Sequence, residues 1–263
     1  MIVDIQFNPT VEPWESIREG VSVAESAGFG TAWVFDHFDG AMLGGTTMLE
    51  CFTLLGAMAA STTTIGLGTL VANVVNRNPG VLAASAASAQ AISNGRFTLG
   101  LGAGTAPNTR WSAEHGHLGI ALAVTMAERH QLLDAALTDL DRWWSPDRPA
   151  EVATFPLPSP RPPVIVGVNS EPLAALAGRR TDGINVRGDH PRLDAIVVAA
   201  VEARRGTDRV GEAMDVSVWA AWDDALADPE HPQRRRWAAL GVTRLVMVFL
   251  QPHDPAAIAR FLG

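Results

Sequence analysis

The sequence predicts a single-domain α/β protein with the (β/α)8 TIM barrel fold, covering residues 1–263, and three observations lead to this prediction. Apolar, β-branched strand patterns alternate with helix patterns along the whole chain. Eight strand–helix pairs fit into 263 residues, a usual length for this barrel. No shift in composition marks a boundary between two domains. A doubly wound open sheet is the alternative that the same alternation allows.

The first two strand–helix pairs combine short apolar runs with longer helical patterns. Residues 2–7 predict a strand, and residues 13–27 predict a helix that ends at a glycine. Residues 31–35 are apolar again and predict the second strand. A glycine-containing loop over 36–47 separates this strand from a helix over 48–60.

The next two pairs lie in the most informative stretch, residues 64–104. Residues 65–71 are apolar and β-branched, and a proline in a first helical turn opens a small-residue helix over 81–92. Residues 96–101 predict a second buried strand, which runs into three small residues. Because such a loop carries almost no side chains, a ligand can approach its backbone.

The second half of the chain continues the alternation after a loop over 105–119. The predicted elements are a helix over 120–144, a proline-rich connector over 145–163, a strand over 164–167, a helix over 171–180, a strand over 183–186, a helix over 191–204, a strand over 215–221, a helix over 229–240, a strand over 244–250 and a helix over 255–262. The connector lies inside a continuing alternation, so we interpret it as a surface excursion and not as a linker between domains.

Composition excludes several kinds of chemistry and partner. The chain has no lysine and no tyrosine, which excludes a lysine Schiff base and a tyrosine acid. The formal net charge of −8 disfavours nonspecific nucleic-acid binding, so we expect a small-molecule partner. The single cysteine, Cys51, excludes an intramolecular disulfide and is not expected to be catalytic. No apolar run is long enough for a membrane span and no secretory signal is evident, so we expect a cytoplasmic protein without membrane contact.

Candidate functional residues follow from the barrel prediction, because barrel chemistry lies at the C-terminal ends of the strands. The second strand ends in Asp36-His37, where His37 is placed to donate or accept a proton. The alternative is that Asp36 caps the loop and His37 packs. The fifth strand ends in Gly167, Val168, Asn169 and Ser170 just before a helix, which is typical of a phosphate cradle. A plain Ser or Asn helix cap explains the same residues.

Three further patterns carry weaker signals. The glycines at 100, 102 and 104 lack the spacing of a dinucleotide fingerprint. Glu114, His115 and His117 cluster in the long loop, but no second cluster accompanies them, so we expect no metal site. Glu114, His115 and Arg110 are alternatives as lid groups over the barrel mouth. Trp111, Trp143 and Trp144 are expected to pack in the core or on the surface and not to bind substrate.

The chain resembles the luciferase-like monooxygenase superfamily, and within it the oxidoreductases that use the deazaflavin coenzyme F420. The resemblance extends over nearly the whole chain in order. It rests on the segments AESAGF (24–29), WVFDHF (33–38), IGLGTLVANVVNRNPGVLA (65–83), SNGRFTLGLGAG (93–104), PPVIVGVNSEPLAALAGRRTDGINV (162–186) and GVTRLVMVF (241–249). It implies a (β/α)8 barrel, often dimeric, with a flavin or deazaflavin in its mouth.

The resemblance also implies roles for particular residues. Asp36 and His37 match the family's pair beside the cofactor ring, with His37 as the acid or hydrogen-bonding group and Asp36 orienting it. A non-prolyl cis peptide that supports the ring falls between Leu70 and Val71. The remaining implied cofactor contacts form two groups. The ring pocket takes Leu70, Val71, Ala72, Asn73, Gly102, Ala103, Gly104 and Thr105, and the phosphate site takes Gly167, Val168, Asn169 and Ser170.

One departure from the family pattern concerns proton transfer. Some deazaflavin-dependent relatives carry a glutamate shortly after the glycines of the fourth strand, whereas residues 105–108 of this chain contain none. Proton transfer then falls to His37, Glu114, His115 or water, or is unnecessary.

Three hypotheses about function follow. The leading one is hydride transfer between coenzyme F420 and a small organic substrate by a homodimeric enzyme. The second is an FMN-dependent monooxygenase that uses molecular oxygen. The third is a noncatalytic flavin-binding protein.

Overall fold

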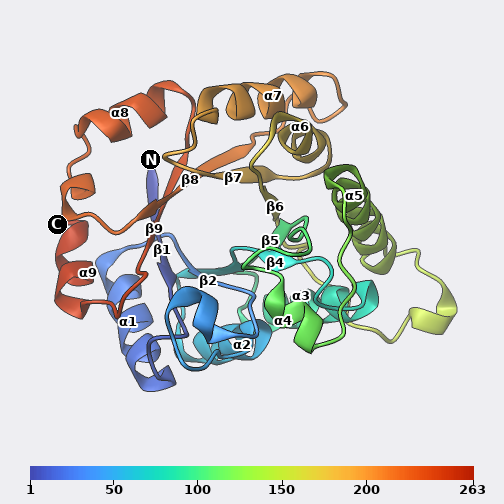
Figure 1. Ribbon diagram of the computed structural model, residues 1–263, viewed down its shortest axis with the longest axis horizontal. Helices are drawn as coiled ribbons and strands as arrows, with labels where there is room; N and C mark the ends of the chain where they lie inside the picture. Colours follow the sequence, from blue (N-terminus) through green and yellow to red (C-terminus); the bar gives the residue numbers. More distant parts are fainter.

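Parallel strands surrounded by helices form a closed barrel in the computed structural model, which describes residues 1–263 (Figure 1). The strands are β1 (Ile2–Phe7), β2 (Thr31–Val34), β3 (Gly66–Thr69), β4 (Ala72–Asn73), β5 (Phe97–Gly102), β6 (Val164–Gly167), β7 (Gly183–Arg187), β8 (Asp215–Ala221) and β9 (Arg244–Val248). They pair in the order β3-β2-β1-β9-β8-β7-β6-β5-β4, and pairing of β3 with β5 closes the ring. Because β3 and β4 share one strand position, the predicted (β/α)8 barrel is confirmed.

Nine helices connect these strands, and most of them cover the barrel. They are α1 (Trp14–Ala27), α2 (Cys51–Ser61), α3 (Pro79–Ile92), α4 (Ala113–His117), α5 (Met126–Trp143), α6 (Glu171–Arg180), α7 (Leu193–Arg205), α8 (Pro232–Ala239) and α9 (Pro255–Phe261). Single 3-10 turns lie at Gly40–Leu43, Ala150–Val152 and Asp224–Ala227. None of the helices combines the length and the apolar character needed to cross a membrane.

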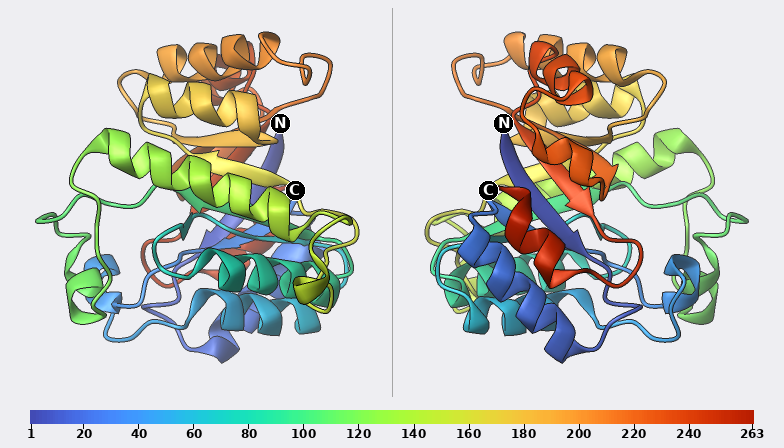
Figure 2. Two further views of the ribbon diagram at one scale, coloured as in Figure 1. Left: turned by 90° about the vertical axis from the view of Figure 1, so that its right-hand side faces the viewer. Right: turned by 90° about the vertical axis from the view of Figure 1, so that its left-hand side faces the viewer.

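Most predicted elements agree with the structure to within a few residues, and the largest differences lie after β5. The helix predicted over 120–144 begins at Met126, because Thr125 and Glu128 form a capping box that fixes its start. The loop predicted over 105–119 contains the short helix α4. Figure 2 shows α4 beside the Gly40–Leu43 turn, away from the helices that cover the strands.

The strand predicted over 65–71 is interrupted by a cis peptide between Leu70 and Val71, as the family resemblance implied. The break separates β3 from β4 and leaves Val71 packed against the glycines of neighbouring strands. A Cβ atom on Gly102 would lie 2.7 Å from Val71 Cγ2, and one on Gly167 would lie 2.9 Å from Val71 Cγ1. Both positions therefore require glycine.

Strand β1 shows how the barrel interior is organised. Val3, Ile5 and Phe7 belong to the main hydrophobic core, and the intervening Asp4 and Gln6 are fully buried polar residues. Gln6 donates to the Leu70 carbonyl over 2.7 Å and accepts from the indole of Trp219 over 2.5 Å. This polar contact ties the interrupted strand to the opposite wall of the barrel.

The N-terminal end of the barrel is closed by polar contacts. Arg244 binds both carboxylate oxygens of Asp4 at 2.9 and 3.0 Å, and the Trp33 indole donates to Asp4 over 3.2 Å. Glu25 accepts from the backbone N–H groups of residues 63, 64 and 65. Arg96 donates to three backbone carbonyls around the end of α2 and the start of β3, and to the Ser93 carbonyl at the end of α3.

Candidate active site

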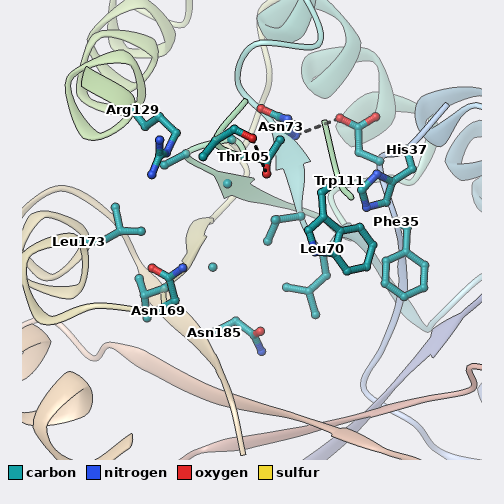
Figure 3. A pocket seen from close by; sticks show the side chains of 18 of the residues that line it. Phe35, His37, Leu70, Asn73, Thr105, Trp111, Arg129, Asn169, Leu173 and Asn185 are labelled. Carbon is teal, nitrogen blue, oxygen red and sulfur yellow. Dashed lines mark hydrogen bonds between the residues drawn. The ribbon is translucent and has the colours of Figure 1, made fainter. Parts of the chain in front are cut away.

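A cavity of about 500 Å³ lies at the C-terminal ends of the strands (Figure 3). Ten of the twelve predicted cofactor contacts line it, and the exceptions are Ala72 and Ser170. The lining residues are Phe35, Asp36, His37, Leu70, Val71, Asn73, Gly102, Ala103, Gly104, Thr105, Ala106, Trp111, His115, Met126, Arg129, His130, Gly167, Val168, Asn169, Leu173, Asn185, Arg187 and Trp219. Strands or loops from most of the barrel thus converge on one cavity, as expected for this fold.

Ala72 does not reach the cavity because its methyl group is fully buried in the hydrophobic core. Its side chain therefore does not border this cavity, and the cofactor contact of Ala72 stays a prediction. Its neighbour Asn73 is half-buried and does line the cavity. Successive residues of a strand point to opposite faces, which explains the difference.

His37 is held by contacts on several sides at one end of the cavity. Its Nδ1 lies 2.7 Å from Glu114 Oε1, and the other Glu114 oxygen accepts from the N–H groups of Phe38 and Asp39 over 2.6 and 3.1 Å. The Trp111 ring stacks on the His37 ring with centroids 5.7 Å apart. Burial alone would raise the pKa of Glu114, but hydrogen bonds from His37 and Phe38 hold this pKa below its usual value.

Asp36 does not orient His37, which corrects the prediction. It forms two hydrogen bonds with Arg77, each 2.8 Å long, and accepts from the N–H of Asn73 over 3.0 Å. Arg77 in turn contacts Glu50 at the start of α2. Asp36 therefore ties the end of β2 to the segment after β4, and the carboxylate that contacts His37 is that of Glu114.

A second histidine, His115, lies in the cavity wall near Asn73. It is 1% exposed, and its Nε2 lies 3.1 Å from Asn73 Nδ2 and 3.0 Å from Asn76 Oδ1. Its Nδ1 is buried without a hydrogen-bond partner. His115 thus adds a second imidazole to the cavity wall, beside an amide that reaches the same cavity.

The opposite side of the cavity carries groups suited to an anion. Ser170 stands at the N-cap of α6 but makes no capping hydrogen bond, and its Oγ is buried without a partner. The plain helix cap is therefore the wrong explanation for Ser170. The first-turn N–H groups of a helix also lack partners within the helix and favour negative charge. Figure 3 shows Arg129, Leu173 and Asn169 across the cavity from His37.

Several lining residues were not predicted from the sequence. Asn185 and Trp219 come from β7 and β8, where the rule that sites lie at strand ends could have identified Asn185. Arg129 and His130 come from α5, and nothing in a helical pattern marks which turn faces a cavity. Trp111 was expected to pack without binding, but it lines the cavity and covers His37. Trp144 packs as predicted, with its indole donating to the Ala83 carbonyl.

Comparison with known proteins gives one family over almost the whole chain. The model of the family described as luciferase-like monooxygenase matches residues 3–259. Among curated proteins, a 5,10-methylenetetrahydromethanopterin reductase from Methanolobus tindarius is 25% identical over 100% of this chain and 78% of its own length. An F420-dependent glucose-6-phosphate dehydrogenase from Microbacterium testaceum is 29% identical over 97% of this chain and 76% of its own length.

Solved structures share the fold at lower sequence identity. An F420-dependent secondary alcohol dehydrogenase, in complex with an F420-acetone adduct, superposes with a TM-score of 0.81 at 16% identity, covering 100% of this chain and 98% of that one. A monooxygenase from Streptomyces bottropensis superposes with a TM-score of 0.76 at 18% identity, covering 100% of this chain and 96% of that one. These likenesses confirm the barrel fold.

Proposed function

This chain belongs to the luciferase-like monooxygenase family and is an oxidoreductase, and we propose that it transfers hydride between coenzyme F420 and a small organic substrate. The observation that carries the proposal is the pairing of an anion cradle with an acid–base group in one cavity. Asn169 and the start of α6 border the cavity, Ser170 is buried behind them at the N-cap, and His37 lies across the cavity. The relatives whose names include F420 support this coenzyme over FMN.

The residues of the cavity fit a phosphorylated ring cofactor. The buried Ser170 Oγ lacks a hydrogen-bond partner, and a phosphate oxygen would supply an acceptor for it. Asn169 adds an amide beside it, and Arg129 adds a positive charge at the cavity wall. The bulge at Leu70 and Val71 and the small residues 102–104 leave room for a planar ring against the backbone.

In this arrangement the protein supplies binding, orientation and proton transfer, and the bound coenzyme supplies the hydride chemistry. Leu70 and Val71 support the ring, and Asn169 and Ser170 hold the phosphate. His37 takes up or donates the proton on the substrate group that is oxidised or reduced. Asp36 keeps the cavity wall in place through Arg77.

Titration of the purified chain with F420 and with FMN tests the proposal. We expect F420 to bind and FMN to bind much more weakly, followed by turnover of one member of a panel of alcohols and carbonyl compounds. Tight FMN binding without F420 binding would overturn the proposal in favour of the monooxygenase. Binding of F420 without turnover of any substrate would favour a noncatalytic binding protein.

We also propose that the enzyme is a homodimer, as the family resemblance implied. Val81 and Ile92 on α3 have side chains that are more than half exposed, and Phe52, Trp143 and Phe155 border the same groove. A second copy would remove this apolar surface from water. Sedimentation equilibrium should give twice the mass of one 27.9 kDa chain, and a monomer at micromolar concentration would contradict the proposal.

A further inference from the structure

The contacts of Glu114 restrict the proton positions on His37. The Glu114 side chain is 1% exposed, and both of its oxygens face hydrogen-bond donors or the imidazole. Oε2 accepts two backbone N–H groups, and Oε1 lies 2.7 Å from His37 Nδ1. An ionised carboxylate can only accept hydrogen bonds. His37 Nδ1 must therefore carry a proton to satisfy this contact.

The other imidazole nitrogen, Nε2, has a different environment. It makes no hydrogen bond within the protein and is not buried, so solvent in the cavity reaches it. Trp111 stacks on one side of the ring, and Phe35 lies 6.5 Å away with its ring tilted. These aromatic neighbours oppose a ring flip that would exchange the two nitrogens.

We propose that Glu114 is a positioning residue that fixes neutral His37 as the Nδ1–H tautomer, so that an unprotonated Nε2 faces the cavity as a proton acceptor. This inference rests on the proposed function, since it specifies the acid–base group of the same site. An unprotonated Nε2 suits a substrate that carries an O–H group and loses its proton in the reaction. Nε2 would take the proton as the O–H bond breaks, and the bound oxidised coenzyme would accept the carbon-bound hydrogen with its electron pair while a C=O bond forms.

The short helix α4 explains how the chain does without the glutamate that some relatives carry after the fourth strand. Residues 105–108 contain no carboxylate, and Glu114 arrives six residues later along the chain from Asn108. The carboxylate then acts through His37 and does not itself border the cavity. Proton transfer is thereby assigned to the imidazole, with Glu114 behind it.

The Glu114→Gln variant is informative because glutamine has one acceptor and one donor end. The N–H groups of Phe38 and Asp39 both require the acceptor, so the amide NH₂ must face His37 Nδ1. Nδ1 then accepts a hydrogen bond, and the imidazole proton moves to Nε2. Glu114→Gln is thus expected to reverse the tautomer and to present a donor to the cavity. Glu19→Gln is the matched control, because Glu19 is exposed on α1.

Nitrogen-15 NMR of histidine-labelled protein without cofactor, at about pH 8.5 where imidazole is neutral, measures the tautomer directly. The His37 signals are assigned by their loss in His37→Gln. We expect at least about a tenfold excess of the Nδ1–H form in the wild type and in Glu19→Gln, and the Nε2–H form in Glu114→Gln.

An Nε2–H tautomer in the wild type, or an Nδ1–H tautomer that persists in Glu114→Gln, would overturn the inference. Should Glu114→Gln fail to fold, the wild-type tautomer still decides, since that measurement needs no variant of Glu114. F420 titrated into the same samples tests the proposed function separately. Absence of F420 binding with the expected tautomers would remove the cofactor assignment and leave the role of Glu114 intact.

Discussion

At the N-terminal end of the barrel, the carboxyl groups of Asp4 and Glu25 are surrounded by donors, whereas at the C-terminal end polar atoms remain without partners. Asp4 binds Arg244 and Trp33, and Glu25 binds three backbone N–H groups. Across the barrel, Ser170 Oγ and His115 Nδ1 are buried without hydrogen bonds.

The difference indicates that the two ends of the barrel have different roles. A buried polar atom without a partner costs about 1–3 kcal/mol, and for Ser170 and His115 a ligand bound in the cavity would supply the partner. The contacts of Asp4 and Glu25 at the other end stabilise the fold that carries the cavity. Changes at the N-terminal end should therefore alter stability, and changes at the C-terminal end should alter binding and turnover.

Removing the Asp4 carboxylate is expected to give the largest effect on stability. Asp4→Ala leaves Arg244 and the Trp33 indole without their buried acceptor, which should lower the free energy of unfolding by about 3–5 kcal/mol. Urea unfolding measures the change. The control is Asp215→Ala, because Asp215 is an exposed partner of the same arginine at 3.9 Å and should cost at most about 1 kcal/mol. Equal losses in the two variants would contradict the special role of Asp4.

Removing the imidazole of His37 should give the largest effect on turnover. We expect His37→Ala to lower kcat by about 10²- to 10⁴-fold, because proton transfer loses its positioned group. The affinity for F420 should change little. The exposed His117 of α4 provides the control, and His117→Ala should retain wild-type kcat. Steady-state kinetics measures both variants, and unchanged kcat in His37→Ala would exclude the acid–base role.

Ser170→Ala should separate binding from stability most clearly. Loss of one hydrogen bond to a phosphate should weaken F420 binding about tenfold, as expected for about 1.4 kcal/mol. The cofactor-free protein should be as stable as the wild type or more stable, because a buried hydroxyl without a partner has been removed. Calorimetric titration with F420 and with a deazaflavin analogue lacking the phosphate measures the effect. Equal weakening for both ligands would show that Ser170 does not contact the phosphate.

The smallest expected effect concerns Glu25 and acid. Burial opposes ionisation of Glu25, but hydrogen bonds from the N–H groups of Thr64, Ile65 and Thr63 lower its pKa from 4.5 to about 2. A carboxyl whose pKa is depressed by folding stabilises the protein above the unfolded pKa and loses this contribution as pH falls from about 4.5 to about 2.

Glu25→Gln should therefore show a weaker decline in stability over that pH range than the wild type. Because Glu25 is partly exposed, the difference should be about 1 kcal/mol. Thermal unfolding at a series of pH values measures it, with Glu19→Gln on the same helix as control. Parallel pH profiles for Glu25→Gln and the wild type would contradict the assignment.

The strand ends at the mouth of the barrel were predictable because strand periodicity and barrel topology determine them together. His37, Asn73 and Asn169 each follow a recognisable apolar strand, and all three line the cavity. The interruption of the third strand between Leu70 and Val71 was implied by the family resemblance and is present.

Partners that depend on loop conformation could not be predicted in the same way. Helix α4 has five residues, which is too short for a helical pattern to be visible in the sequence. The contact of Glu114 with His37 spans 77 residues, and that of Arg77 with Asp36 spans 41. Such pairs are determined by the packing of the loops over the barrel, and no local spacing encodes them.

A crystal structure of the protein in complex with F420 tests the central claim most directly, because it places the coenzyme relative to both His37 and Ser170. We predict the ring against Leu70 and Val71, its phosphate within hydrogen-bond distance of Ser170 Oγ, and His37 Nε2 facing the substrate side of the ring. Density for F420 outside this cavity, or a phosphate bound away from Ser170 and the start of α6, would contradict the account.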